Sequence, residues 1–205
     1  MRGSWNGSHL LYARCAREST HLPCSLPARE VHLEVLGVSE VGASAVGLAE
    51  ELIEAIDWGS YRRLAGDSAA GVGQVLMSLL TSDRGRVETA RDFLENEIAP
   101  QSNLYSAAEP AVSVLAASLA DPRPRWVRIA VLDLMFLILS GAPVQEEVER
   151  GNGALRERCI IRVRESLWLI VREAFADIAC YEAVLDVLDI VDPGGAANEL
   201  VRLSR

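Results

Sequence analysis

Apolar residues recur every three or four positions along most of the chain beyond residue 44, which is the spacing of one face of an α-helix. In the first such segment, the residues on the apolar face are Leu48, Leu52, Ile53 and Ile56. The residues expected on the opposite, solvated face are Glu50, Glu51 and Glu54. We predict that this helix ends at Trp58 and that a long glycine-spaced connection, 59–73, follows it.

The same spacing predicts further helices over 72–80, 84–98, 111–120, 125–141, 155–179, 182–191 and 198–203. Asp83 is placed to cap the helix that follows it, and Pro100 to end that helix. The longest predicted helix, 155–179, carries one apolar stripe of Ile160, Val163, Leu167, Ile170 or Val171, Ala174 and Ile178. The charged, glycine-flanked segment 142–153 is interpreted as a linker. Because turn-bounded clusters of β-branched residues are scarce, the predicted fold class is all-α.

Residues 1–42 differ from the rest of the chain. They hold all three histidines and two of the four cysteines, without a sustained helical period. We predict a poorly ordered extension over 1–42 and a helical repeat domain over 43–205. The alternative is a zinc site, for which the candidate ligands are Cys15, His21, Cys24 and His32, with His9 nearby. Their spacing matches no common zinc finger, so the extension is the preferred interpretation.

A repeat of 40 residues is the most informative feature of the pattern. Its matching pairs are Leu79 and Leu119, Val87 and Val127, Ala90 and Ala130, and Leu94 and Leu134. In each copy a helix ends in leucine, a turn carries an aspartate, and a helix with a valine and a small alanine follows. We expect Asp83 and Asp121 each to cap the second helix, and the alanine to let two helices approach closely. One helix pair cannot bury its apolar face alone, so such pairs are expected to stack.

The second copy resembles the central D-x-x-V-R-x-x-A-x-x-x-L pattern of a HEAT-type repeat, with two additional residues after the aspartate. The residues that carry this resemblance are Asp121, Val127, Arg128, Ala130 and Leu134. The first copy has Glu88 where the family often has arginine. Trp58-x-x-Tyr61, the run from Gln101 to Tyr105, and Ala108-Glu109-Pro110 are similar to further pieces of bacterial HEAT-repeat proteins. The resemblance covers about residues 50–192, and its motifs are degenerate.

The resemblance implies a short right-handed α-solenoid, HEAT- or armadillo-like, with three to four stacked antiparallel helix pairs. Proteins of this family act mostly as protein-binding scaffolds. Some bacterial members are antitoxin-like or immunity proteins, and a few bind DNA. These roles are implied by the family alone and do not follow from the periodicity.

Charge narrows the set of partners. The net charge is −9, and every one of the 20 basic residues is an arginine. An acidic balance makes a general phosphate-neutralising surface unexpected, so nucleic acid is the less favoured partner. The same balance either keeps the protein dispersed or marks it for a basic protein partner. Since no apolar run approaches the ~18 residues of a membrane helix and no signal peptide is recognised, we expect a cytoplasmic protein without membrane contact.

Residues for catalysis are hard to assemble in the repeat region. Histidine does not occur after His32, so the region has no histidine for a nucleophile–base pair. Cys159 and Cys180 are interpreted as small buried residues with free thiols. The glutamates of the first helix and the set Glu146, Glu147 and Glu149 have the composition of solvated segments. We therefore expect no enzyme activity, no metal in the repeat domain and no cofactor.

Candidate contacts with a partner come from charged and aromatic residues. The densest basic run is Arg156, Arg158, Arg162 and Arg164, which is either a solvated face or a contact with an acidic partner or phosphate. From the charged surface we single out Arg158, Arg162, Glu50 and Glu54 as candidate partner-binding residues. The tryptophans Trp58, Trp126 and Trp168 are interpreted as packing residues, although an exposed one would be a binding anchor.

The function that the family resemblance and the acidic balance together imply is non-enzymatic binding of another protein. Its most specific form is an antitoxin-like or immunity protein that sequesters a basic partner. The alternative is a HEAT-like nucleic-acid-binding protein or DNA glycosylase, which would need a basic groove with a catalytic carboxylate.

Overall fold

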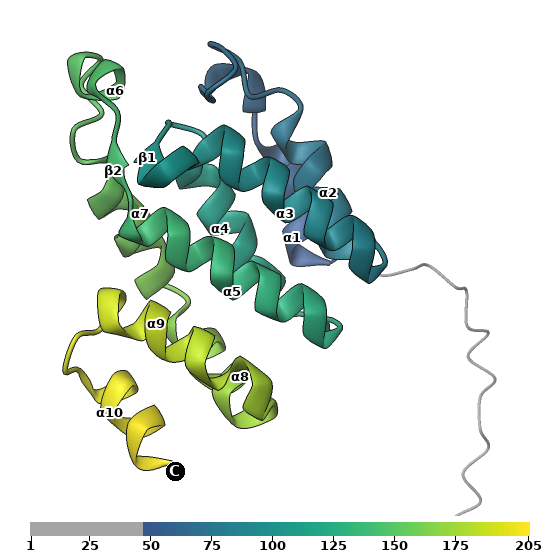
Figure 1. Ribbon diagram of the computed structural model, residues 1–205, viewed down its shortest axis with the longest axis vertical. Helices are drawn as coiled ribbons and strands as arrows, with labels where there is room; N and C mark the ends of the chain where they lie inside the picture. The colour runs from purple at the N-terminus through teal and green to yellow at the C-terminus, as the bar shows by residue number, and fades with distance from the viewer. Residues whose placement is uncertain (1–46) are drawn as a thin grey trace, which may run out of the picture. The chain divides into compact units, whose positions relative to one another are not determined.

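The computed structural model describes residues 47–205, and that part of the chain is mostly helical, as predicted (Figure 1). Its α-helices are α1 (Leu48–Ala55), α2 (Val72–Thr81), α3 (Arg84–Ile98), α4 (Ala108–Ser118), α5 (Arg125–Ser140), α6 (Gln145–Glu149), α7 (Leu155–Arg164), α8 (Leu167–Ala176), α9 (Tyr181–Val191) and α10 (Ala196–Leu203). Single 3₁₀ turns lie at Trp58–Ser60, Pro100–Ser102 and Ile178–Cys180. Two-residue strands, β1 (Asn103–Leu104) and β2 (Ala142–Pro143), form one parallel pair. The predicted extension, 1–42, and its candidate zinc ligands lie outside the described residues.

Neighbouring helices pack in two rows. In one row α2 packs on α3, α3 on α5, and α5 on α9; in the other, α1 packs on α4 and α4 on α7 (Figure 1). The rows meet where α4 contacts α5 and where α7 contacts α5 and α9, and α10 packs on α8 and α9. Every apolar residue of the 40-residue repeat is buried between these helices: Leu79, Val87, Ala90, Leu94, Leu119, Val127, Ala130 and Leu134. The two copies therefore turn the same positions inward.

The repeat turns differ in how they start the next helix. Asp83 caps α3, because its carboxylate accepts a hydrogen bond from the backbone N–H of Arg86 at 3.3 Å. The same prediction for Asp121 is wrong, since α5 begins after Pro124 without a side-chain cap. The two additional residues of this turn shift Asp121 away from the helix start, and its carboxylate instead faces the Arg123 guanidinium at 3.4 Å.

The predicted long helix 155–179 is wrong as a single element. It is broken between Arg164 and Leu167 into α7 and α8. Because of the break, α7 packs on α4 while α8 packs on α9 and α10. A single straight helix over 155–179 would not contact both sets of neighbours. Its predicted stripe is also incomplete, because Ile178 lies on the following 3₁₀ turn with 67% of its surface exposed.

The predicted solvated faces of two acidic segments also need correction. Glu50 of α1 is buried, and its carboxylate lies 2.7 Å from the Arg123 guanidinium, whereas Leu48, expected on the apolar face, is 55% exposed. Within the predicted linker 142–153, Glu147 of α6 is fully buried. Its carboxylate accepts hydrogen bonds from the Ser106 backbone N–H at 3.0 Å and from the Asn152 amide at 2.7 Å. A buried charge is stable only when it has such partners. Each carboxylate therefore links its own helix to a segment that is distant in the sequence or to the following turn.

The bounds of α2, α3, α5 and α9 lie within one residue of prediction, whereas α1 ends at Ala55 instead of Trp58, and α4 and α10 begin two or three residues earlier than predicted. Trp58 is a packing residue, as expected. Its indole N–H donates to the Ile53 carbonyl at 3.0 Å. Gly73, at the start of α2, lies against the indole ring, where a Cβ would come within 2.6 Å of the ring nitrogen. Among residues 47–205, none of the helices combines the length and the apolar character that a membrane span requires.

Candidate functional site

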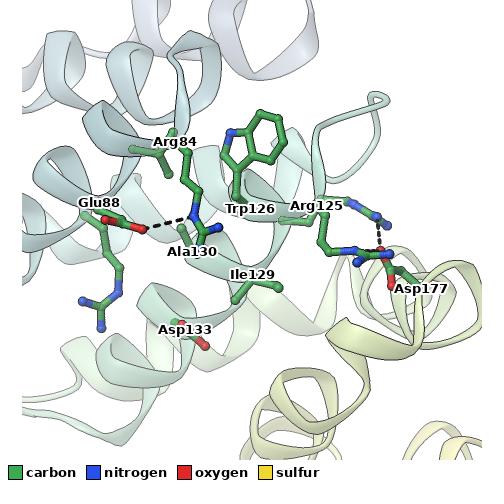
Figure 2. Close-up of a pocket in the computed structure, with 11 residues that line it drawn as sticks. Arg84, Glu88, Arg125, Trp126, Ile129, Ala130, Asp133 and Asp177 are labelled. Atoms are coloured by element: carbon green, nitrogen blue, oxygen red, sulfur yellow. Dashed lines mark hydrogen bonds and ion pairs between the residues drawn. The ribbon is translucent and has the colours of Figure 1, made fainter.

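A groove of about 730 Å³ runs between α3 and α5 (Figure 2). It extends to Asp177, the residue before the 3₁₀ turn Ile178–Cys180. Helix α3 contributes Arg84, Val87, Glu88 and Arg91 to its lining. Helix α5 contributes Arg125, Trp126, Arg128, Ile129, Ala130 and Asp133, and Asp177 closes one end. We call this surface the α3–α5 groove.

The 3.6-residue periodicity of the α-helix places four residues of α5 in a line along the groove. Trp126, Ile129, Ala130 and Asp133 are spaced as i, i+3, i+4 and i+7, so they share one face of the helix. Ala130 is nearly buried against α3, whereas Trp126 keeps 41% of its surface exposed. Trp126 is therefore an exposed aromatic side chain in the lining of the groove, and it is not a buried packing residue.

The four arginines of the α3–α5 groove are each paired with a carboxylate of the protein itself. Arg84 pairs with Glu88 at 3.3 Å and Arg125 with Asp177 at 2.6 Å. The remaining two pairs join Arg128 to Glu173 at 2.7 Å and Arg91 to Asp92 at 3.0 Å. The groove is thus rich in arginine without being a basic surface.

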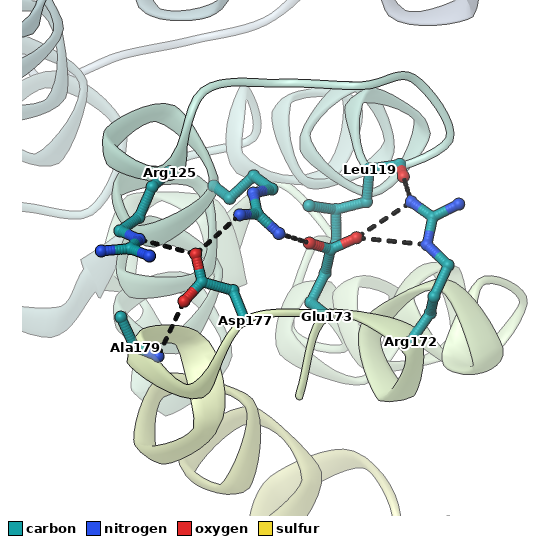
Figure 3. A network of polar contacts seen from close by, with 7 residues as sticks. Leu119, Arg125, Arg172, Glu173, Asp177 and Ala179 are labelled. Carbon is teal, nitrogen blue, oxygen red and sulfur yellow. Dashed lines mark hydrogen bonds and ion pairs between the residues drawn. The ribbon is translucent and has the colours of Figure 1, made fainter. Parts of the chain in front are cut away.

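Two of these pairs belong to a network that joins α5 to α8 (Figure 3). Asp177 accepts hydrogen bonds from Arg125 at 2.6 Å and Arg128 at 2.9 Å, and from the Ala179 backbone N–H at 3.1 Å. The hydrogen bond from Arg125 is the main cause that lowers the pKa of Asp177. Glu173, which is 2% exposed, lies between the guanidinium groups of Arg128 and Arg172.

The network also reaches the turn after α4, where the Arg172 guanidinium donates to the Leu119 carbonyl (Figure 3). Hydrogen bonding to Glu173 raises the pKa of Arg128, so this guanidinium stays charged. Charged hydrogen bonds of this kind fix side-chain positions more firmly than neutral ones. One wall of the α3–α5 groove is therefore held in place by its own ion pairs.

Asp133 differs from every other charged residue of the groove. Among the described residues its carboxylate has no hydrogen bond and no ion pair within 4.0 Å, although the side chain is partly buried on α5. Burial raises its pKa, the charge of Asp186 on α9 raises it further, and Arg91 on α3 opposes the rise. The protein therefore keeps one carboxylate of this groove unpaired, at the cost of its desolvation.

The candidate partner-binding residues chosen from the sequence lie elsewhere. Arg158 pairs with Glu109 at 2.6 Å, and Arg162 lies 3.7 Å from the carboxylates of Glu109 and Glu165. Glu50 is paired with Arg123, and Glu54 lies exposed on α1. The basic run of α7 is used inside the fold, because Arg156 and Arg164 also donate to backbone carbonyls, those of Leu139 and Val191.

Sequence reasoning missed the α3–α5 groove because it treated the tryptophans as packing residues. That interpretation is wrong for Trp126 and for Trp168, which is 62% exposed on α8. A usable signal was present in the most apolar segment, 131–139, which contains a single charged residue, Asp133. A carboxylate in such a segment needs a polar partner, and Asp133 has none within residues 47–205.

The two described cysteines are buried, as expected. Burial is the first cause that raises the pKa of Cys159, to about 12, and also raises the pKa of Cys180. Both thiols therefore stay protonated at neutral pH and are poor nucleophiles. Within residues 47–205, no three His, Cys, Asp or Glu side chains gather in a way that could hold a metal ion.

No family model, no curated protein and no solved structure matches this chain. Its function therefore has to be inferred from its own surface. The α3–α5 groove is larger than three other surface cavities of residues 47–205. It combines an exposed indole, arginines that are paired with carboxylates and one carboxylate that has no ion pair among the described residues.

Proposed function

We propose that this protein is a non-enzymatic binding module that recognises another protein through the α3–α5 groove. The observation that carries the proposal is the position of Trp126, which is 41% exposed and lines a cavity of about 730 Å³. Tryptophan and arginine are the residues that most often dominate the energy of protein interfaces. Here both types line one groove, and ion pairs with Glu173 and Asp177 hold Arg128 and Arg125 in place.

A scaffold role is supported by the arrangement of the helices. The proposed architecture is a short right-handed α-solenoid of HEAT-like helix pairs, in which α2 with α3 and α4 with α5 are the two copies of the 40-residue repeat. The burial of the same positions in both copies supports this assignment. Solenoids expose rows of equivalent positions along one face, and those rows are their usual binding surfaces.

A protein partner fits the groove better than nucleic acid does. Phosphate binding needs cations that are free to replace the counterions of the backbone. The arginines of the α3–α5 groove already have carboxylate partners at 3.3 Å or less, and the chain carries a net charge of −9. An antitoxin-like or immunity role, in which the module sequesters a basic protein, is the most specific form of the proposal.

The test compares two exposed tryptophans. Tagged wild-type protein, Trp126→Ala and Trp168→Ala are used to capture proteins from the source cells, and the bound proteins are identified by mass spectrometry. We expect one partner to be retained by wild type and by Trp168→Ala and to be lost with Trp126→Ala. Retention by all three variants would place the binding surface elsewhere.

The same variants are tested for nucleic acid. Fluorescence anisotropy with labelled duplex and single-stranded DNA at physiological salt should show no binding tighter than the ~10⁻⁴–10⁻⁶ M of non-specific association. Tighter binding that depends on Trp126, without any protein partner, would replace the proposal with the nucleic-acid alternative.

A further inference from the structure

The charges around the α3–α5 groove are balanced everywhere except near Asp133. Each arginine of the lining has a carboxylate partner within 3.3 Å. Asp133 on α5 has none, and Asp186, the carboxylate of α9 that repels it, is exposed and has no ion pair among the described residues either. Arg91 lowers the pKa of Asp133, but it is itself paired with Asp92 and Glu95. This end of the groove therefore carries more negative than positive charge, and a cation from outside would offset the difference.

Packing does not explain an aspartate at this position. The equivalent residue of the first repeat copy, 40 positions earlier, is Phe93, an apolar side chain that is 39% exposed. The repeat thus accepts an apolar residue where the second copy has a partly desolvated carboxylate. A charged residue that costs stability and makes no internal contact is typical of a functional site.

The two distinctive residues of the groove are separated by two helical turns. Trp126 and Asp133 are seven positions apart on one face of α5, which corresponds to about 10 Å along the helix axis. Ile129 and Ala130 form the apolar surface between them (Figure 2). A ligand that uses both ends needs an apolar group for the indole and, about 10 Å away, a cationic group for the carboxylate.

We propose that the α3–α5 groove binds a basic segment of a partner protein, in which one arginine or lysine side chain pairs with Asp133 while a neighbouring apolar side chain packs on Trp126. This inference rests on the proposed function, since it assigns the chemistry of the partner at the same groove. The arginine rim does not oppose such a segment, because its charges are already neutralised by Glu88, Asp177, Glu173 and Asp92. An acidic segment would have to break those pairs and would face the unpaired Asp133.

The experiment is an affinity selection of a displayed library of random peptides on the full-length protein. Four proteins are used as bait: wild type, Asp133→Asn, Trp126→Ala and the control Glu51→Gln. Asp133→Asn keeps the size of the side chain and removes its charge. Glu51 supplies a matched control because it is an exposed carboxylate on α1, outside the groove, and has no ion pair among residues 47–205. Thermal melting of each bait confirms that it is folded.

With wild type and Glu51→Gln we expect enriched peptides that carry arginine or lysine beside an apolar residue. With Asp133→Asn the apolar preference should remain and the basic preference should disappear. A selected peptide should bind Asp133→Asn about tenfold more weakly than wild type, the effect of one charged hydrogen-bonded contact. Replacing its basic residue by glutamine should weaken binding to wild type equally and should not weaken binding to Asp133→Asn further.

Two failures are distinguishable. Peptides that need Trp126 but show no basic preference, or prefer acidic residues, would overturn this inference and leave the proposed protein-binding groove intact. The absence of any peptide whose binding depends on Trp126 would count against the proposed function itself.

Discussion

Each copy of the 40-residue repeat lines a groove with the same face of its second helix, but the two grooves differ in chemistry. The first groove, of about 410 Å³, lies between α2 and α3, and the second is the α3–α5 groove. The lining positions that correspond are Arg86 and Trp126, Thr89 and Ile129, Ala90 and Ala130, and Phe93 and Asp133. In each copy the lining positions are spaced as i, i+3, i+4 and i+7, so they lie on one face of the helix.

The order of charge and aromatic ring is reversed between the copies. In the first groove Arg86 stands near the helix start, paired with Asp83 at 3.1 Å, and Phe93 stands two turns later. In the second, Trp126 stands first and the unpaired Asp133 last. Only the alanine between them is the same, because it determines how closely the neighbouring helix can approach. Helix packing requires a small residue at the position of Ala90 and Ala130, whereas the residues at the two ends of the face differ between the copies.

The two grooves also differ in how firmly their walls are held. Arg86 and its partner Asp83 are mostly exposed, with 75% and 65% of their side-chain surfaces accessible. Arg128 and Glu173, beside the α3–α5 groove, are 16% and 3% accessible. Exposed pairs add little to stability, whereas removing one member of a buried pair leaves a charge without a partner. The second groove is therefore the one with a preorganised wall.

The largest effect is expected from Glu173→Ala. It leaves Arg128 and Arg172 without their shared carboxylate, so the free energy of unfolding should fall by about 3 kcal/mol. Urea denaturation measures the change. The control is Arg86→Ala at the first groove, which should change stability by less than about 0.5 kcal/mol. An equal loss of unfolding free energy in Glu173→Ala and Arg86→Ala would mean that ion pairs hold the two groove walls equally firmly.

The next largest effect concerns the alanines that the copies share. Ala90 and Ala130 are 5% and 7% exposed and lie where neighbouring helices approach. Ala130→Trp and Ala90→Trp should each lower the free energy of unfolding by about 2 kcal/mol, because the ring does not fit between the helices. Thermal melting with urea denaturation tests both. A variant that melts like wild type would show that the groove beside its alanine has room for the ring, and this alanine would then not determine how closely the two helices approach.

Much of this fold could be predicted from the sequence, because helical periodicity and helix-stop residues act locally. The apolar spacing identified α2, α3, α5 and α9 to within a few residues. The errors arise where contacts distant in sequence decide the structure. Glu50 and Glu147 look like solvated glutamates until Arg123 and Ser106 are brought beside them by the fold. The break between α7 and α8 likewise depends on packing against different neighbours.

The candidate site was less predictable than the fold. Arg158 and Arg162 are close together in the sequence and therefore look like a basic surface. In the fold both form ion pairs with Glu109, which lies 49 positions before Arg158. Trp126 and Asp133 are seven positions apart in the sequence, and both line the cavity between α3 and α5. The spacing of residues along the chain does not predict that cavity.

A smaller effect is expected from Trp126→Ala. Since 41% of this side chain is exposed, its truncation should cost only about 1 kcal/mol of stability, well below the cost of removing a core side chain. The fully packed Trp58 provides the comparison, and Trp58→Ala should cost about 3 kcal/mol or more. Urea denaturation of both variants decides the matter. A loss for Trp126→Ala as large as that for Trp58→Ala would identify Trp126 as a core residue and remove the basis for calling it an anchor.

The smallest expected effect has the opposite sign and comes from Asp133→Asn. Burial raises the pKa of Asp133 above its ordinary value of 3.8, so at neutral pH the folded state bears the cost of an unfavourable charge. Asparagine removes that cost, and the variant should be more stable than wild type by less than about 1 kcal/mol, because water still reaches and screens the carboxylate. The gain should be complete above the raised pKa of the folded state. It should shrink as the pH falls through that pKa and vanish below 3.8, where both states of the wild type are protonated. Urea denaturation of both proteins between pH 3 and pH 7 measures the difference. A constant difference across this range, or a loss of stability at neutral pH, would show that the Asp133 carboxylate is satisfied within the fold and is not held free for a partner.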